Sequence, residues 1–212
     1  SVADADCIGK VVDILHKEYK AGESFAVVFS AFKGITNELI KMSRLAAKGD
    51  LAYKDHFEEF SSRHLQVADE MLDGDARASV RAFLMENHEV LYNLLFGIFL
   101  VREVSPRTKD YVLSFGERNS AYIISQVLMH RGIPAEYLDA RKVIVTDKDF
   151  GNAKVNLPLT SEKIIEYFSE KEGIIQIATG FIGSDQGGLT TTLGRGGSDY
   201  SAALLAGALD AE

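Results

Sequence analysis

Short, mostly apolar segments alternate with longer segments of helical periodicity, and this alternation constrains the fold more than any other feature. Residues 25–29, 111–115 and 174–178 have the character of strands buried on both faces. Residues 135–138 and 143–145 are predicted to be shorter strands. Strands that alternate with helices indicate an α/β fold, here a three-layer αβα sandwich with a mostly parallel sheet and helices on both faces.

The longest helical region, residues 51–104, has few breaks, of which Asp73-Gly74-Asp75 is the clearest. It predicts two or three long helices without obvious chemistry. We expect a helical insertion, packed beside the sheet, within one partial domain that spans residues 1–212.

The other helices have local start and stop signals. Residues 2–19 are predicted to be a helix capped by Ser1 or Asp4, and residues 117–130 another that follows a turn at Gly116. A helix capped by residues 158–161 is predicted to end near Lys171. Residues 183–188 are predicted to be a polar loop, and Ser198 or Asp199 is expected to open the last helix.

Composition narrows the class of protein. Apolar residues make up 46% of the 212 residues and charged residues 25%, as in soluble globular domains. The formal net charge of −8 lacks the basic excess of a nucleic-acid binder. The longest apolar stretch, residues 91–101, is too short to span a membrane. Cys7 is the single cysteine, so no internal disulfide can form, and we expect a buried, unreactive thiol.

The clearest candidate site is the glycine-rich turn at residues 190–200, just before the last helix. Consecutive glycines let backbone amides approach an anion, and the helix N-terminus adds partial positive charge. Arg195 can hold a carboxylate or phosphate with two hydrogen bonds. Ser198 can donate from its hydroxyl, and Asp199 can orient a cation. An ordinary turn capped by Ser198 or Asp199 is the alternative.

Two further polar segments follow predicted strands, and ligands of open α/β sheets bind at the carboxyl ends of strands. In the first, Ser30 and Thr36 either face a ligand or, with Asn37, serve only to begin a helix. In the second, Glu117 is either a structural acid in a first helical turn or the acceptor of a substrate ammonium group.

The remaining ionisable residues do not suggest a metal site. No two histidines have metal-ligand spacing, and the acids of the long helical region are predicted to form a solvated face. These residues are His16, His56, His64, His88 and His130, and Glu58, Glu59, Asp69 and Glu70.

Several stretches, in this order, resemble the aspartokinase family within the amino-acid kinase superfamily. They are Ser1-Val2-Ala3, residues 27–31 with 34–37, Phe115-Gly116-Glu117, residues 179–183, and residues 190–203. The resemblance covers most of the chain, and the last stretch is the most specific.

The resemblance implies an amino-acid kinase fold and transfer of the γ-phosphoryl group of ATP to the side-chain carboxylate of L-aspartate. The product, 4-phospho-L-aspartate, leads toward lysine, threonine and methionine. The resemblance also implies L-aspartate, ATP and Mg²⁺ as ligands and a cytoplasmic homo-oligomer. Such transfer depends on alignment and charge stabilisation rather than on a covalent intermediate.

The resemblance further assigns roles to residues. Arg195 would pair with the α-carboxylate of aspartate, and Glu117 would place its ammonium group. Asp199 would position the family's catalytic lysine. The other residues implied are Thr36, Phe181 and Ser198 for aspartate, Gly196 and Gly197 as amide donors to the transferring phosphate, and Ser30 and Ala31 close to that phosphate.

The family's Lys-Phe-Gly-Gly-Thr segment, with its catalytic lysine, does not precede Ser1 in this sequence, and the segment with most adenosine contacts would follow Glu212. The sequence therefore predicts a half-site for aspartate with little kinase activity in isolation. The alternatives are a kinase of glutamate, acetylglutamate, carbamate or a nucleotide, and a non-catalytic module that binds amino acids or anions.

Overall fold

The computed structural model describes residues 2, 4–22 and 25–211. Ser1 and Ala3, part of one stretch that carries the resemblance, lie outside the described residues, as does the cap predicted at Ser1. In chain order the elements are α1 (Ala5–Lys20), β1 (Ala26–Phe29), α2 (Ile35–Lys48), α3 (Tyr53–Met71), α4 (Gly74–Val101), α5 (Pro106–His130), β2 (Ala135–Leu138), the short 3-10 helix η1 (Ala140–Lys142), β3 (Val145–Thr146), α6 (Leu157–Phe168), β4 (Ile175–Thr179), β5 (Ile182–Asp185), β6 (Thr190–Thr192) and α7 (Gly197–Leu209).

The strands form two small sheets. In the first, β4 lies between β1 and β2, and all three strands are parallel, with Ile177 paired to both Val27 and Tyr137. In the second, β5 pairs parallel with β3 and antiparallel with β6. The prediction of a mostly parallel α/β sheet is confirmed, although the strands divide between two sheets.

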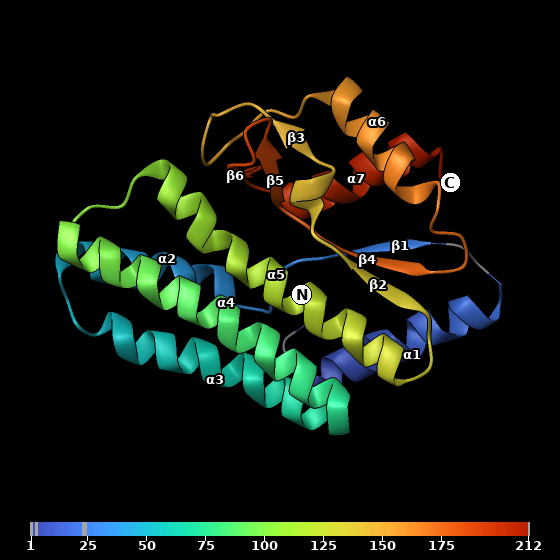
Figure 1. Ribbon diagram of the computed structural model, residues 1–212, viewed down its shortest axis with the longest axis horizontal. Coiled ribbons are helices and arrows are strands. Elements are labelled where there is room, and N and C mark those ends of the chain that lie inside the picture. Colours follow the sequence, from blue (N-terminus) through green and yellow to red (C-terminus); the bar gives the residue numbers. More distant parts are fainter. Residues whose placement is uncertain (1, 3, 23–24, 212) are drawn as a thin grey trace.

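Helices cover both faces of the first sheet, as the predicted layers require. Helix α7 packs on β1, whereas α5 packs on β2 and β4 from the opposite face (Figure 1). Helix α6 lies beside α7, and α1 packs against α5 and α3. Strand β4 is buried along its whole length, in keeping with a sequence that is apolar except for Gln176 and Thr179.

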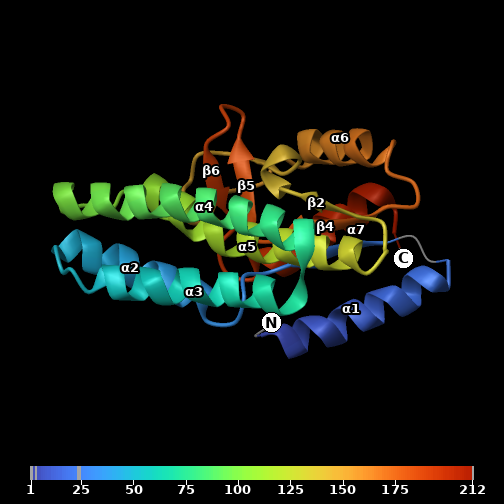
Figure 2. The same ribbon diagram turned by 60° about the horizontal axis from the view of Figure 1, so that its bottom comes forward.

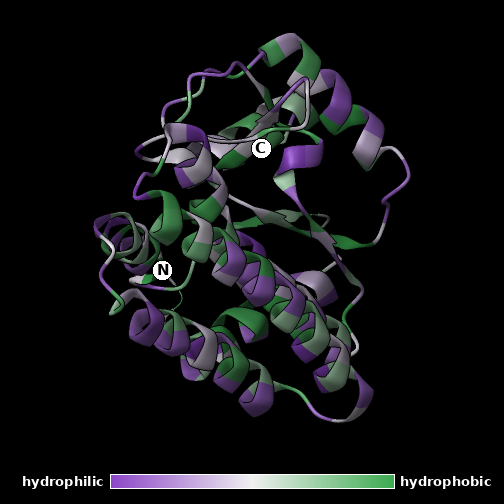
Figure 3. Cartoon of the chain, turned by 60° about the vertical axis from the view of Figure 1, so that its left-hand side comes forward, coloured by the Kyte–Doolittle hydropathy of each residue, from purple (hydrophilic) through white to green (hydrophobic). Residues whose placement is uncertain are grey.

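Helices α3 and α4 confirm that residues 51–104 form long helices. They pack against each other and against α2, and both touch α5, so that α2, α3, α4 and α5 lie side by side (Figure 2). Their hydrophobic faces turn inward and their hydrophilic faces outward (Figure 3). That these residues are an insertion stays a prediction. Among the described helices, none combines the length and apolar character that a membrane span requires.

Residues 111–115 are not a strand, and this prediction was wrong. They belong to α5, a helix of 25 residues that is buried on nearly all sides between the sheet and α2 and α4. A helix buried all round has no polar face to show its period, so a short apolar run within it looks like a buried strand. Gly116 and Glu117 therefore lie in the middle of a helix and do not follow a strand.

Other boundaries differ by a few residues. Asp4 caps α1 as predicted, by accepting a hydrogen bond from the Cys7 amide at 2.9 Å. The predicted strand 143–145 begins only at Val145, because residues 140–142 form η1. The predicted loop 183–188 starts inside β5. Helix α6 is capped by Asn156 and ends at Phe168 rather than near Lys171.

Candidate active site

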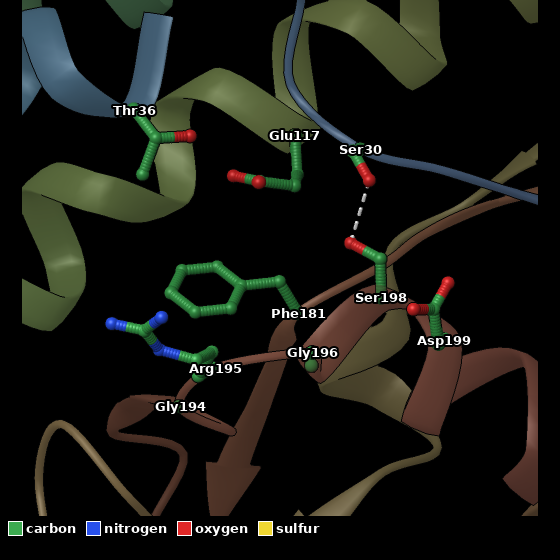
Figure 4. A pocket seen from close by; sticks show the side chains of 10 residues that line it. Ser30, Thr36, Glu117, Phe181, Gly194, Arg195, Gly196, Ser198 and Asp199 are labelled. Carbon is green, nitrogen blue, oxygen red and sulfur yellow. Dashed lines mark hydrogen bonds between the residues drawn. The ribbon is translucent and has the colours of Figure 1, made fainter. Parts of the chain in front are cut away.

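A cleft of about 340 Å³ lies at the carboxyl ends of β1 and β4. The structure brings together there nearly all the residues that the sequence singled out, from three separate stretches of the chain (Figure 4). Ala31 is buried beside the cleft and contributes a backbone amide to it. The lining residues are Ser30, Thr36, Glu117, Phe181, Gly194, Arg195, Gly196, Gly197, Ser198 and Asp199.

The glycine turn is built for a close approach of backbone. Gly194 and Gly196 both have φ of +75°, in the left-handed region that favours glycine. A Cβ on Gly197 would lie 2.8 Å from the Phe181 ring and 3.1 Å from its Cα, so only glycine fits. Gly196 is the N-cap of α7 and offers no side-chain cap, which corrects the predicted cap at Ser198 or Asp199. The first turn of α7 thus lines the cleft with an uncapped, partly positive helix end.

Ser198 ties this helix end to the other wall. The Ser30 hydroxyl donates to Ser198 Oγ at 2.7 Å. Gly180, directly after β4, makes the approach possible, because a Cβ there would lie 2.9 Å from Ser198 Cα. The Ser120 hydroxyl donates to the Ser30 carbonyl at 2.8 Å and so joins the same wall to α5.

Phe181 takes a conformation that is rare for a bulky residue, with φ of +67°. Its amide donates to Ser201 Oγ at 3.1 Å, and its carbonyl accepts from the Leu193 amide at 2.9 Å. The backbone is thus fixed on both sides, and the ring stands between Glu117 and Arg195 in the cleft (Figure 4).

Glu117 is the buried acid of the cleft, with 3% of its surface exposed. Its Oε1 accepts from the Ala31 amide at 3.3 Å, whereas Oε2 has no hydrogen-bond partner among the described residues. Burial raises the pKa of Glu117 to about 8, and the Ala31 amide offsets only part of that effect. The carboxyl is therefore mostly protonated at neutral pH. A cationic group that binds beside it would lower its pKa, so that the carboxyl would ionise.

Arg195 and the helix N-terminus at Thr36 supply the groups of the cleft that can bind anions. Arg195 is exposed and makes no ion pair within the described residues. Thr36 lies in the first turn of α2, whose N-cap is Gly34, at φ of +88° and without a side-chain cap. The cleft thus combines one acid, one free guanidinium and two uncapped helix N-termini, a set suited to a ligand with one cationic and several anionic groups.

Asp110 is a supporting residue that the sequence did not reveal. It is buried on α5, and it accepts hydrogen bonds from the Gly151 amide at 2.8 Å and from the Thr192 amide and hydroxyl at 2.9 Å. Burial raises its pKa despite these three donors. Asp110 thereby fixes β6, which leads into the glycine turn, to the helix that carries Glu117. No local pattern could have shown this, because the partners lie 41 and 82 residues away.

The carboxylates of the cleft do not form a cage for a metal ion. Within the described part of the chain, three side chains could ligate an ion together, namely Glu38, His56 and Glu59, and they lie outside the cleft lining. Asp199 is the exposed acid of the cleft.

Comparison with known proteins agrees with the fold. The profile of the amino acid kinase family matches residues 1–212. The chain is 35% identical over 219 residues to "Lysine-sensitive aspartokinase 3" of Escherichia coli, covering 100% of this chain and 45% of that protein. It is 34% identical over 192 residues to "Aspartokinase 2, chloroplastic" of Arabidopsis thaliana, covering 86% of this chain and 34% of that protein.

Among solved structures, E. coli aspartokinase III in complex with aspartate and ADP superposes with a TM-score of 0.87 at 31% identity. The match covers 100% of this chain and 45% of that one. The chain belongs to the amino acid kinase family. It spans about half the length of the E. coli relative, and less of the plant ones.

Proposed function

We propose that the protein containing this chain is an aspartate kinase, and that the cleft binds L-aspartate. It would transfer the γ-phosphoryl group of ATP to the side-chain carboxylate and form 4-phospho-L-aspartate. The observation that carries this proposal is the pairing, in one cleft, of a buried carboxyl with a free oxygen, Glu117 Oε2, and the free guanidinium of Arg195. The aspartate and ADP bound by the similar E. coli enzyme support it.

In this proposal each end of the amino acid meets the opposite charge. The ammonium group donates to Glu117 Oε2, which becomes fully ionised, and the α-carboxylate pairs with Arg195 through two hydrogen bonds. Thr36 and the Phe181 ring complete the wall around the side chain. The reacting carboxylate then points to the first turn of α7, where the incoming phosphate would lie.

The chain's own residues supply alignment and charge stabilisation. A carboxylate is already nucleophilic at neutral pH, so no general base is needed, and the cleft must hold two anions in line. The amides of Gly196 and Gly197 and the hydroxyl of Ser198 would face the transferring phosphoryl group, with Ser30 and Ala31 beside it. Mg²⁺ brought with ATP would neutralise phosphate charge, and Asp199 would orient a nearby cation.

Binding of L-aspartate to the chain, measured by calorimetry, tests the proposal. Succinate lacks the ammonium group and L-glutamate is one methylene longer, so both should bind at least about tenfold more weakly. Arg195→Ala should weaken aspartate binding by about 100-fold. Arg77→Ala removes an exposed arginine of α4 that is not among the lining residues, and serves as the control.

Turnover separates the enzyme from its alternatives. Release of ADP in the presence of aspartate, measured on the longest encoded polypeptide that contains this chain, should exceed release with glutamate or acetylglutamate. A preference for another acceptor would indicate a different amino-acid kinase. Tight aspartate binding without any ADP release would indicate a non-catalytic binding module.

A further inference from the structure

The helical region α3–α4 has no part in the cleft lining, yet it contacts both segments that position Glu117. The first segment is the loop 30–34 after β1, whose Ala31 amide donates to Glu117. The second is the middle of α5, which carries Glu117 itself. Contacts from α3 reach the loop, and contacts from α4 reach α5.

On the loop side, two neighbouring residues of α3 hold the backbone. Arg63 Nη1 donates to the Lys33 carbonyl at 2.8 Å. The fully buried His64 ring stacks on Phe32, with ring centroids 5.3 Å apart and planes at 19°. Phe32 directly follows Ala31, so the amide that binds Glu117 sits in a loop braced by α3.

On the α5 side, a chain of hydrogen bonds crosses from α5 to α4 and on to α3. Arg118 Nη2 donates to Asn87 Oδ1 at 2.6 Å, and Asn87 Nδ2 donates to Asn119 Oδ1 at 3.2 Å. Asn119 Nδ2 then lies 3.2 Å from His88 Nε2, and His88 Nδ1 lies 2.9 Å from Ser61 Oγ. Asn87, His88 and Asn119 are each at most 5% exposed.

Arg118, at the charged end, fixes which group donates and which accepts in each of these hydrogen bonds. A guanidinium can only donate, so Asn87 must present its oxygen to Arg118 and its amide group to Asn119. Asn119 therefore presents its own amide group to His88, and the imidazole must accept at Nε2. His88 consequently carries its proton on Nδ1 and donates to Ser61. Burial keeps the imidazole neutral, with a pKa of about 4.

The geometry of a helix connects this chain to the cleft. Residues two apart on an α-helix point about 200° away from each other, so Asn119 faces α4 while Glu117 faces the cleft. Gly116 fits closely against the loop after β1 and against α2: a Cβ there would lie 2.8 Å from the Ala31 Cβ and 3.2 Å from Ile35 Cγ2. With α5 held on both sides, its rotation about its axis, and hence the direction of Glu117, is determined.

We propose that Asn119 and His88 are positioning residues for Glu117: the hydrogen-bond chain from Arg118 to Ser61 sets the rotation of α5 and so places the carboxyl against the Ala31 amide. Its consequence for ligand affinity rests on the proposed function, but its effect on the Glu117–Ala31 hydrogen bond does not. The region 51–104 then acts as the support that aligns the acid of the cleft.

A matched pair of variants tests this proposal. In His88→Gln, the side-chain amide oxygen can take the place of Nε2 and accept from Asn119. The shorter side chain in His88→Asn reaches only the position of Nδ1, so it leaves Asn119 without an acceptor. His88→Asn should speed hydrogen exchange of the Ala31 amide at least about tenfold and weaken aspartate binding by a similar factor. His88→Gln should stay within about threefold of the wild-type protein in both measurements.

Leu91→Ala is the control for a purely structural effect, because Leu91 is fully buried on the same helix as His88 but takes no part in the hydrogen bonds from Arg118 to Ser61. It should lower the melting temperature at least as much as His88→Asn without selective loss at Ala31. If His88→Asn does not fold, Ser61→Ala removes the end of the chain and should loosen Ala31 to a smaller degree.

The proposal is overturned if hydrogen exchange of the Ala31 amide is unchanged in His88→Asn, or in Ser61→Ala where that variant takes its place. It is also overturned if Leu91→Ala speeds exchange of the Ala31 amide as much as His88→Asn does. If the wild-type chain does not bind aspartate, the proposed function fails, and the Ala31 exchange still decides whether His88 positions Glu117.

Discussion

The two walls of the cleft are built in different ways. The α7 wall is made of backbone: glycines at positive φ, an uncapped helix end and the strained Phe181. The α5 wall depends on one buried side chain, Glu117, which accepts a hydrogen bond from the Ala31 amide and lies on a helix packed against α2, α3 and α4. The first wall is encoded within one continuous stretch, residues 181–199. The second is encoded in residues far apart, so substitutions should affect the two walls differently.

The largest effect is expected at the acid. Glu117→Gln keeps the shape but cannot become an anion for the ammonium group, so aspartate affinity should fall about 100-fold or more. Isothermal titration calorimetry measures this loss. Binding within a factor of three of wild type would mean that the acid does not recognise the amino acid.

The same variant should be more stable than the wild-type chain at alkaline pH. The pKa of Glu117 is about 8 in the folded chain and ordinarily 4.5. Below pH 4.5 the carboxyl is protonated in both states, so folding carries no penalty. Between about pH 4.5 and 8 the unfolded carboxyl ionises first, and wild-type stability falls as pH rises. The advantage of Glu117→Gln should therefore grow across this window and then level off, as denaturant unfolding at several pH values would show.

The connection between the walls should be the next most sensitive point. Asp110→Ala leaves two buried amides and a hydroxyl without their acceptor, and should cost about 3 kcal/mol of unfolding free energy. Asp110→Asn can still accept from both amides, and the Thr192 hydroxyl can turn to accept from the new amide group. We expect it to retain most of the stability. Equal losses in the two variants would show that the charge, not the hydrogen-bond geometry, matters.

A smaller effect is expected at the backbone wall. Gly180→Ala places a Cβ 2.9 Å from the Ser198 Cα, so α7 must shift, at a cost of about 1–3 kcal/mol. Gly207→Ala is the matched control, since a Cβ there meets nothing within 4 Å and α7 should gain about 0.5–1 kcal/mol. Thermal unfolding of both variants separates steric strain at the cleft from helix propensity.

These contrasts explain what the sequence could predict. The parallel strands and the glycine turn have local signals, namely mostly apolar runs and clustered glycines, so the sequence predicts both. Glu117 stands out in the sequence as an acid at the start of a predicted helix, but the preceding turns of the same helix, residues 111–115, resemble a strand because α5 is buried on nearly all sides and shows no amphipathic period. Asp110 and the chain through Asn119 escaped notice because their partners are 31 to 82 residues away. Only the folded chain brings such groups together.

We expect the cleft to recognise an amino acid through the buried carboxyl of Glu117, which gives up its proton on binding. Aspartate binding at pH 7, followed by calorimetry in buffers with different heats of ionisation, measures the protons released. With the Glu117 pKa at about 8 in the free chain, release should approach one proton per aspartate and should disappear in Glu117→Gln. Binding of equal affinity without proton release, or with the same release in Glu117→Gln, would contradict the account.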